Sequence, residues 1–383
     1  MAAGHFLPNV GGVERYIYNL SRALIRQGCE VSVLTTQSED APLIETMDGI
    51  DVFRLPSLHL GGGRLPVPKL FNKQVLAQLA AVEAWQPDIF VIHTHLFLSN
   101  LCAARLARRT QTPQVLVNHG SGFVKGGNFA INLALQGYEH LLARQIGRHS
   151  AEAFGVSQSA AKWLSEFGID TGQVIANGVD IASMPKRSAE FRHRLGLSDD
   201  ACMIAFAARL LPEKGADTLI AAFKKLNPAD AGLVIAGDGP AMGALKGLSD
   251  GDSRITFLGA CRHSDVLQMF GSADIMAYPS RYPEGQPTTV LEAGAMGCAV
   301  IASPRGGTAE LIDNPDLGII TDCQSDLELA LNKLINDAAY RKHLGTNLQR
   351  KVHTLHDWRI IAERAAATFS RIVTKHKETV LSQ

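Results

Sequence analysis

The stretch IMAYPSRYPEGQPTTVLEA, residues 275–293, joins a short apolar run to a helical pattern through a loop rich in proline and glycine. The run Ile275–Ala277 is typical of a strand buried on both faces, and the residues from Thr288 onward have the apolar spacing of a helix. Glu284 lies in the loop, and Glu292 follows eight residues later inside the helix. Ligands of parallel α/β sheets bind at such strand-to-helix loops. The stretch therefore predicts an α/β fold with a ligand site at the end of this strand.

Short apolar runs alternate with amphipathic segments through the rest of the chain, which is typical of parallel sheets covered by helices. In the first half we predict strands at Glu30–Thr36, Asp51–Leu55, Asp88–His93, Gln114–Asn118, Ala151–Val156 and Gln173–Ile175. The helices between them are predicted at Val13–Gln27, Pro68–Trp85, Leu98–Arg109, Asn128–Arg148 and Ser159–Phe167. The alternation restarts after residue 180, with strands at Cys202–Ala207, Gly232–Ala236, Arg254–Leu258, Ile275–Ala277, Cys298–Ala302 and Gly318–Thr321.

A polar, proline-containing stretch from Asn177 to Arg187 separates the two runs of this alternation. We predict an N-terminal domain over residues 1–180, a C-terminal domain over 181–355 and a final helical segment over 356–383. In that segment Asp357 is a suitable N-cap, and apolar residues keep a helical spacing as far as Arg371. Two doubly wound domains in series place the carboxyl ends of their strands opposite each other, which predicts a ligand cleft between them.

The charge balance excludes one function class. Lysine plus arginine and aspartate plus glutamate number 37 each, whereas a nucleic-acid-binding protein usually carries a basic excess. With 46% hydrophobic and 19% charged residues, the chain has the composition of a folded globular protein. The six cysteines occur singly, without the spacing of a zinc site, as is typical of free thiols in a reducing compartment. Because the sequence pattern shows neither a signal peptide nor an apolar run of about 18 residues, the predicted location is the cytoplasm.

Two cations follow the predicted strand Cys202–Ala207. Arg209 and Lys214 lie five residues apart, at the carboxyl end of that strand. Such a pair can hold a diphosphate, the arginine through its planar fork and the lysine as a point charge. A surface ion pair between Lys214 and Glu213 is the alternative interpretation.

Further candidates lie in the first half of the chain. Gly11 and Gly12 precede the first predicted helix, where glycine lets the backbone approach a ligand and the helix N-terminus favours phosphate. His119 lies just beyond the strand Gln114–Asn118, a position suited to substrate contact. His93 and His95 face one side of a strand, but no acidic residue or cysteine lies near them in the sequence. For this pair we expect a packing or acceptor-side role rather than a metal site.

The spacing of Glu284 and Glu292 resembles the E-x7-E motif of retaining glycosyltransferases. Together with the R-x4-K pair Arg209 and Lys214 and the N-terminal glycine loop, it resembles glycosyltransferase family 4 from that loop to the C-terminal helix. The resemblance implies the α/β fold called GT-B, with two facing Rossmann-like domains and a cleft between them. It also implies transfer of a sugar from a nucleotide-sugar donor to a hydroxyl acceptor with retention at the anomeric carbon. The last helix would pack back on the first domain.

The same resemblance implies roles for individual residues. Arg209 and Lys214 would stabilise the leaving diphosphate, Glu284 would orient the sugar hydroxyls, Glu292 would hold the ribose and His119 would contact the sugar. The implied catalytic residues are therefore His119, Glu284, Arg209 and Lys214. The implied donor-binding residues are Gly11, Gly12, Arg209, Lys214, Gly237, Leu258, Glu284, Gly285, Thr288, Thr289, Val290 and Glu292. No cofactor and no metal are expected, because the two cations and the helix start can neutralise the diphosphate.

Two local expectations accompany the resemblance. Members of the family have a complete hydrophobic strand before the glycine loop, and only Met1–Pro8 precede it here, so we expect a first strand that is short by a few residues. The loop with Gly306, Gly307 and Glu310 is expected to line the nucleotide side of the site.

The acceptor side has a local charge of +5 over residues 101–150. Its charged residues are Arg105, Arg108, Arg109, Lys125, Arg144 and Arg148, against the single acid Glu139. Mixed with apolar residues, this segment suits the inner face of an anionic membrane and a lipid-linked acceptor, and a solvated helix face is the alternative. The expected partners are a nucleotide-sugar donor and a sugar or lipid-linked acceptor, in surface polysaccharide or glycolipid biosynthesis.

Other enzyme classes share parts of this pattern. A sugar-nucleotide epimerase or phosphorylase has the same fold, and a nicotinamide-dependent oxidoreductase has similar domains. The oxidoreductase hypothesis is weakened because Gly237 and Gly239 are followed by Gly243, which breaks the G-x-G-x-x-G spacing. Asp250 and Asp252 lie in a polar stretch before a strand, which favours a turn over a metal-binding pair.

Overall fold

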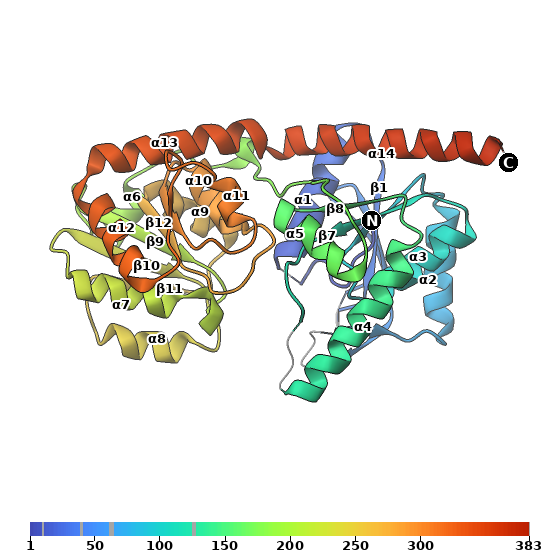
Figure 1. Ribbon diagram of the computed structural model, residues 1–383, viewed down its shortest axis with the longest axis horizontal. Helices are drawn as coiled ribbons and strands as arrows, with labels where there is room; N and C mark the ends of the chain where they lie inside the picture. The colour runs from blue at the N-terminus through green and yellow to red at the C-terminus, as the bar shows by residue number, and fades with distance from the viewer. Residues whose placement is uncertain (10, 39–40, 61–64, 125–127, 383) are drawn as a thin grey trace. The chain divides into compact units, whose positions relative to one another are not determined.

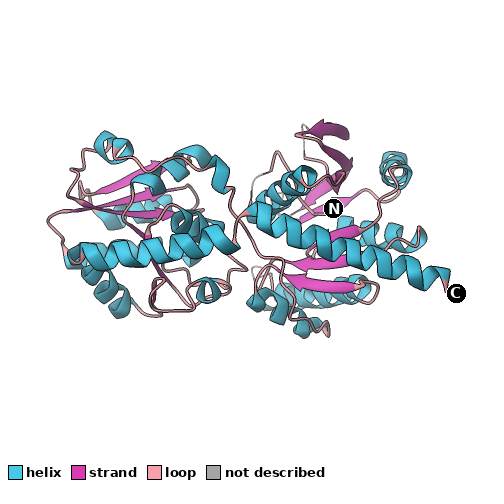
Figure 2. Ribbon diagram, turned by 90° about the horizontal axis from the view of Figure 1, so that it is seen from above, coloured by secondary structure: helices cyan, strands magenta, loops and turns pink. Residues whose placement is uncertain are grey.

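The computed structural model describes residues 1–9, 11–38, 41–60, 65–124 and 128–382 (Figure 1). The chain divides into two units, Met1–Asn177 together with Trp358–Gln383, and Gly178–Asp357. In each unit strands lie between helices (Figure 2). Each unit has the layered α/β architecture that the alternating sequence pattern predicts.

Parallel strands form the centre of the N-terminal unit. They are β1 (Val31–Thr36), β3 (Ile50–Leu55), β6 (Phe90–His93), β7 (Gln114–Asn118) and β8 (Glu152–Gly155), with β2 (Ile44–Met47) antiparallel to β3. A separate hairpin pairs β4 (Ser57–Leu60) with β5 (Leu65–Pro68). Ala2 forms parallel bridges with Leu34 of β1 and Ile92 of β6, and so joins the two groups of strands. The short first strand expected from the sequence is this single bridging residue.

Helices cover both faces of this sheet. They are α1 (Gly12–Arg26), α2 (Lys73–Ala84), α3 (Leu98–Arg109), α4 (Phe129–Gly147), α5 (Gln158–Trp163), the 3-10 turn η1 (Leu164–Phe167) and α14 (Trp358–Leu381). On one face, Val33 and Val117 belong to the same cluster as Tyr16 of α1 and Trp358 of α14. Successive strand residues point to opposite faces, so the neighbouring residues Leu34 and Leu116 lie on the other face, where they pack with α2, α3 and α4. The last helix of the chain therefore belongs to the N-terminal unit, where it lies beside α1.

The C-terminal unit has one parallel sheet. Its strands are β9 (Cys202–Ala207), β10 (Ala231–Ala236), β11 (Ile255–Gly259), β12 (Ile275–Tyr278), β13 (Ala299–Ala302) and β14 (Ile319–Ile320). The spatial order β11-β10-β9-β12-β13-β14 is the 3-2-1-4-5-6 order of dinucleotide-binding sheets. The order reverses between β9 and β12, which pair directly. Ligands of such sheets bind beyond the carboxyl ends of the strands at this reversal.

Apolar runs fill the core of this unit. Ile204, Phe206, Ile275 and Ala277 are fully buried, as expected for strands covered on both faces. The surrounding helices are η2 (Ile181–Ser183), α6 (Glu190–Arg194), η3 (Pro212–Lys214), α7 (Ala216–Leu226), α8 (Met242–Ser249), α9 (His263–Ser272), α10 (Thr288–Ala295), α11 (Thr308–Leu311), α12 (Gln324–Asn336) and α13 (Ala338–Leu355). All six cysteines are free thiols. None of the helices among the described residues is long and apolar enough to cross a membrane.

Four predicted segments differ from the structure by more than two residues at one end, or do not form the predicted element. The helix predicted at Pro68–Trp85 begins only at Lys73, because Leu65–Pro68 pairs as β5 and the Asn72 side chain caps the helix. The segment Gln173–Ile175 forms only an isolated bridge, between Val174 and Gly155.

Two helix ends were also predicted wrongly. The segment Ser159–Phe167 is α-helical only to Trp163 and continues as the 3-10 turn η1, which ends at Gly168 in the left-handed conformation. The final helix does not end at Arg371 but runs to Leu381. Its buried residues stop at Ile372, and beyond it the sequence has no repeated apolar spacing that would indicate further helix.

Candidate active site

The loops that follow β9 and β12 bring Lys214 and Glu284 together. Because these strands are neighbours, their loops meet, and the Arg281 N–H donates to the Glu213 carbonyl at 2.7 Å. The Lys214 ammonium contacts Glu284 Oε1 as a hydrogen-bonded ion pair in which both side chains are largely buried. The alternative surface pair between Lys214 and Glu213 is therefore wrong.

The contacted oxygen of Glu284 is shared by further donors. The Tyr278 hydroxyl donates to Oε1 at 3.0 Å, and the Ser280 hydroxyl lies 3.4 Å from the same atom. Burial, together with the Glu284 carboxylate, raises the pKa of Tyr278 far above its ordinary value. Tyr278 thus stays protonated and keeps its donor role. The sequence does not indicate this role for Tyr278, because the contact depends on how the loop with Glu284 folds back toward the end of β12.

A glycine holds the backbone of Glu284 in place. Gly306 has φ 59°, and a Cβ atom there would lie 1.5 Å from the Glu284 carbonyl oxygen. The next residue, Gly307, donates its N–H to the carbonyls of Glu284 at 3.2 Å and Gly285 at 2.9 Å. The loop with Gly306 therefore supports the loop with Glu284 directly.

Replacing Gly306 with alanine is expected to destabilise the packing of the two loops. The new Cβ atom would clash with the Glu284 backbone, and the left-handed φ of Gly306 is unfavourable for alanine. We expect a loss of about 2–4 kcal/mol in the free energy of unfolding. Urea unfolding measures this loss. The control is Gly243→Ala in α8, where a Cβ meets open space and the helix gains up to about 1 kcal/mol. Equal stability of the two variants would contradict the packing described here.

Arg209 lies at the other side of the β9 loop. Its side chain is exposed and forms no ion pair with any carboxylate that the structure describes. Gly237, at φ 127°, ends β10 so close to this loop that a Cβ would lie 1.9 Å from the Ala208 carbonyl oxygen. An exposed arginine without an intramolecular partner can bind an anion at this loop.

Glu292 lies inside α10 and is almost fully buried. Its Oε1 is 2.8 Å from Nε2 of His263, the first residue of α9. The sequence gives no sign of the contact with His263, because it depends on how α9 and α10 pack. The imidazole thus fixes the carboxylate that was predicted to hold the ribose.

The remaining predicted donor-binding residues lie at the start of α10 and at the end of β11. Pro287 occupies its N-cap position with no side-chain cap, and Thr288 and Thr289 are partly exposed in the first turn. Gly285 and Leu258 of β11 are also partly exposed. Val290, by contrast, is fully buried, so its only group for a ligand is the backbone N–H.

In the N-terminal unit, His119 lies directly after β7. The Nδ1 atom of His93, at the end of β6, is 3.1 Å from Nε2 of His119. The Tyr16 ring contacts His119 edge-on, with 4.6 Å between ring centroids. Burial lowers the pKa of His119 to about 3, and burial together with His119 lowers the pKa of His93 well below its ordinary value. Both imidazoles are therefore neutral at neutral pH.

These two neutral imidazoles predict that acid destabilises the protein. In the unfolded chain, each histidine binds a proton below its ordinary pKa of 6.5. In the folded chain, His119 binds its proton only near pH 3. The free energy of unfolding should fall by about 1.4 kcal/mol per pH unit for each such histidine. Urea unfolding between pH 7.5 and pH 5 measures the slope. His119→Gln should reduce it, whereas His149→Gln, at an exposed position of the same unit, should not.

At the glycine loop, the carboxylate of Glu14 occupies the start of α1. Gly11 is the N-cap of α1, and the Glu14 carboxylate lies close to it. Burial raises the pKa of Glu14. A Cβ at Gly11 would lie 2.4 Å from Glu14 Oε2, while Gly12 faces open space. The helix start predicted to favour phosphate thus already holds a carboxylate.

The expectation that His95 has no acidic partner was wrong. The sequence places no acidic residue near it, but α4 brings Glu139 Oε2 to 3.6 Å from His95 Nε2, with both side chains buried. The other oxygen of Glu139 accepts the Val124 N–H at 2.9 Å. Within the described residues, no three histidine, cysteine, aspartate or glutamate side chains come together as metal ligands would. The absence of a metal from the reaction stays a prediction.

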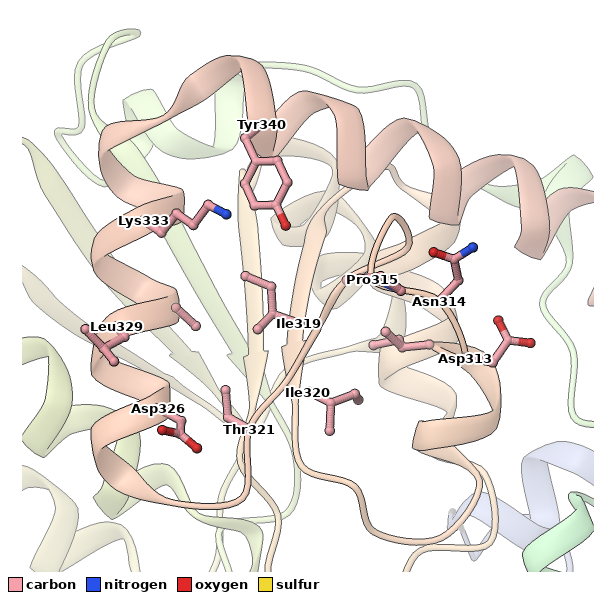
Figure 3. Close-up of a pocket in the computed structure, with 13 residues that line it drawn as sticks. Asp313, Asn314, Pro315, Ile319, Ile320, Thr321, Asp326, Leu329, Lys333 and Tyr340 are labelled. Carbon is pink, nitrogen blue, oxygen red and sulfur yellow. The ribbon is translucent and has the colours of Figure 1, made fainter.

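A shallow pocket of about 540 Å³ lies elsewhere in the C-terminal unit, beside the edge strand β14 (Figure 3). Ile319, Leu329 and Tyr340 line it, and the Lys333 ammonium lies 3.9 Å from the Tyr340 ring centroid. None of the predicted site residues lines this pocket.

Solved structures share this fold. The chain is similar to the sucrose-phosphate synthase of Thermosynechococcus elongatus, with a TM-score of 0.80 and 21% identity over 98% of each chain. It is also similar to the Anabaena protein HepE, solved in complex with UDP-glucose, with a TM-score of 0.75 and 20% identity over 97% of this chain and 98% of that one. The fold is that of a GT-B glycosyltransferase.

Sequence relatives give the same class. An uncharacterised glycosyltransferase of Methanocaldococcus jannaschii is 28% identical over 94% of each chain. The D-inositol 3-phosphate glycosyltransferase of Stackebrandtia nassauensis is 28% identical, over 88% of this chain and 81% of the relative. A GDP-mannose-dependent monoacylated alpha-(1-6)-phosphatidylinositol monomannoside mannosyltransferase of Corynebacterium glutamicum is 26% identical over 94% of each chain.

Two family profiles account for both units. Residues 10–183 match Glycosyltransferase Family 4, and residues 188–351 match Glycosyl transferases group 1. The chain therefore belongs to the family 4 glycosyltransferases, and it is a glycosyltransferase enzyme. The resemblance stated from the E-x7-E spacing is confirmed, and nothing in these matches supports an oxidoreductase.

Proposed function

We propose that the enzyme transfers a hexose, with retention at the anomeric carbon, from a nucleotide-sugar to a hydroxyl of an inositol phosphate or a glycolipid. The observation that carries this proposal is the contact of Lys214 with Glu284 at the strand-order reversal of the C-terminal sheet. It brings together, at the usual ligand position of such a sheet, a cation suited to phosphate and a carboxylate suited to sugar hydroxyls. The names of the inositol-directed relatives support this acceptor class.

In the proposed reaction the diphosphate leaves the sugar and is stabilised by Arg209 and Lys214. Glu284, held through Oε1, orients the sugar hydroxyls, and Glu292, held by His263, binds the ribose. The acceptor hydroxyl attacks the same face of the sugar and passes its proton to the leaving phosphate. The neutral His119 contacts the sugar without carrying charge. The proposed place of this reaction is glycolipid or surface polysaccharide biosynthesis in the cytoplasm.

A matrix of substrates tests the proposal. UDP- and GDP-hexoses are each incubated with inositol 3-phosphate, with phosphatidylinositol vesicles or with no acceptor, and the released nucleoside diphosphate is measured. We expect acceptor-dependent release with at least one pair. Nucleotide release without any acceptor dependence would support a hydrolase instead, and a changed nucleotide-sugar without nucleotide release would support an epimerase. An inositol phosphate that fails where the lipid succeeds would assign the lipid acceptor.

A lipid-linked acceptor also requires a membrane-facing surface, and we propose that α4 provides it. Phe129, Leu133, Leu141, Arg144 and Arg148 are exposed and fall within one side of the helix by its 3.6-residue period. Exposed apolar side chains beside arginines favour an anionic lipid surface. Of the basic residues predicted for this surface, Lys125 lies outside the described residues, and Arg109 is paired with Glu83.

Flotation with vesicles of phosphatidylserine and phosphatidylcholine tests this surface. The wild type should float with the vesicles at low salt, and the double variant Phe129→Ala/Leu133→Ala should stay at the bottom. The control is Leu329→Ala, an equally exposed leucine of the C-terminal unit, which should float like the wild type. Failure of the wild type to float would leave the soluble inositol phosphate as acceptor.

A further inference from the structure

One contact joins the rings of His93 and His119, from Nδ1 of His93 to Nε2 of His119 at 3.1 Å. Because both rings are neutral, one of these nitrogens carries the proton and the other accepts it. Two arrangements are possible, one with His93 as the donor and one with His119 as the donor. The choice fixes which nitrogen of His119 carries its proton.

The second nitrogen of His93 decides between the two arrangements. The His93 side chain is fully buried, and its Nε2 has no hydrogen-bond partner among the described residues. If His93 accepted at Nδ1, its proton would sit on Nε2, and a buried N–H would have no acceptor. If His93 donates from Nδ1, its Nε2 is unprotonated, and the buried group without a partner is an acceptor rather than a donor. Orphaned buried N–H groups are rare in proteins, and unsatisfied acceptors less so.

The position of His93 is itself fixed. The Asn100 side-chain amide donates to the His93 carbonyl at 2.6 Å and to the Thr94 carbonyl at 2.8 Å. On the other side of the pair, Tyr16 is anchored by its hydroxyl, which donates to the Ile175 carbonyl at 2.9 Å. The ring of Tyr16 contacts both imidazoles edge-on. The two histidines therefore meet in one defined geometry.

We propose that His93 is a positioning residue that sets the tautomer of His119. The His93 Nδ1–H donates to His119 Nε2, so that His119 carries its own proton on Nδ1. His119 is a partly exposed residue, and its Nδ1 makes no hydrogen bond to any residue that the structure describes. His119 therefore offers a ligand an N–H donor and no basic nitrogen.

The consequence for the reaction rests on the proposed function. With this tautomer His119 donates a hydrogen bond to an oxygen of the donor sugar and cannot take the proton of the acceptor hydroxyl. That proton must then go to the leaving phosphate. The tautomer itself is a property of the free protein and is measured without any substrate.

Long-range ¹H–¹⁵N spectra of the ¹⁵N-histidine-labelled full chain at pH 7 test the tautomer, because protonated and bare ring nitrogens have distinct shifts. The signals of His119 and His93 are assigned by their loss in His119→Gln and His93→Asn. We expect both residues to carry the proton on Nδ1. A proton on Nε2 of His119 would overturn the proposal, whether or not the enzyme transfers sugar.

Two variants test the positioning role. His93→Asn keeps an N–H donor near the place of Nδ1, whereas His93→Leu removes it. We expect His93→Leu to shift the His119 tautomer and to lower kcat about ten-fold with the Kd for nucleoside diphosphate unchanged. His93→Asn should retain the Nδ1–H form of His119 and most of kcat. The same His119 spectrum and the same kcat in both variants would contradict the proposal, and the wild-type spectrum decides if His93→Leu does not fold.

Discussion

Replacing Glu284 with alanine is expected to lower kcat for sugar transfer by about 10²–10³-fold, the range found when one preorganised polar group of an active site is removed. Lys214, Tyr278 and Ser280 all contact Oε1 of this side chain, so its orientation is set before a substrate binds. Initial rates with the best donor and acceptor pair measure the loss, and circular dichroism checks the fold.

The matched control is Glu328→Gln. Glu328 also pairs with a lysine of the same unit, Lys225, at 2.7 Å, but that lysine is exposed and lies in the last turn of α7, whereas Lys214 precedes the first. This variant should keep the wild-type rate. Full activity of Glu284→Ala would show that the carboxylate has been assigned wrongly.

The second large effect is expected from the two cations. Lys214→Met and Arg209→Met should each weaken the binding of a nucleoside diphosphate by about 10–100-fold, the loss of one charged hydrogen bond. Arg209→Lys should recover only part of the affinity, because it keeps the charge and loses the planar fork. Isothermal titration with UDP and GDP measures these affinities.

Lys214 has a second effect that separates binding from stability. Its removal leaves the Glu284 carboxylate without its cation, so Lys214→Met should also lower the free energy of unfolding by about 1–2 kcal/mol. The double variant Lys214→Met/Glu284→Gln should regain that stability and still bind nucleoside diphosphate weakly. Recovery of nucleotide affinity in the double variant would mean that Lys214 acts only through Glu284.

The strands of the core could be predicted from the sequence because their apolar runs are bounded by polar, glycine and proline residues. Cys202–Ala207 and Gln114–Asn118 were predicted to the residue, and the other core strands to within two residues at each end. The hairpin of β4 and β5 was missed, because Pro66 and Pro68 weaken a strand pattern that exists only through pairing at an edge.

Part of the candidate site could be predicted for a similar reason. Arg209, Lys214 and Glu284 each follow a predicted strand, and the carboxyl ends of parallel strands share one edge. The sequence does not show that β9 and β12 are neighbours, which is what pairs Lys214 with Glu284 rather than with Glu213.

Long-range side-chain contacts could not be predicted from the sequence. His263 reaches Glu292 across two helices, and Glu139 reaches His95 from α4. Neither contact leaves a local pattern, since the partners are far apart along the chain and meet only through packing. The pair of His93 and His119 was not predicted either: their strands β6 and β7 are neighbours only in the structure, and the tautomers follow only from burial.

The anomeric configuration of the product tests the central claim most directly. The enzyme is incubated with an α-linked nucleotide-hexose and the acceptor that gives the highest rate, and the product is observed by ¹H NMR in the first minutes of the reaction. A retaining enzyme with the site described here gives an α-linked product, which disappears in the Glu284→Ala variant. A β-linked product, or an α-linked product made equally well by Glu284→Ala, would contradict the account.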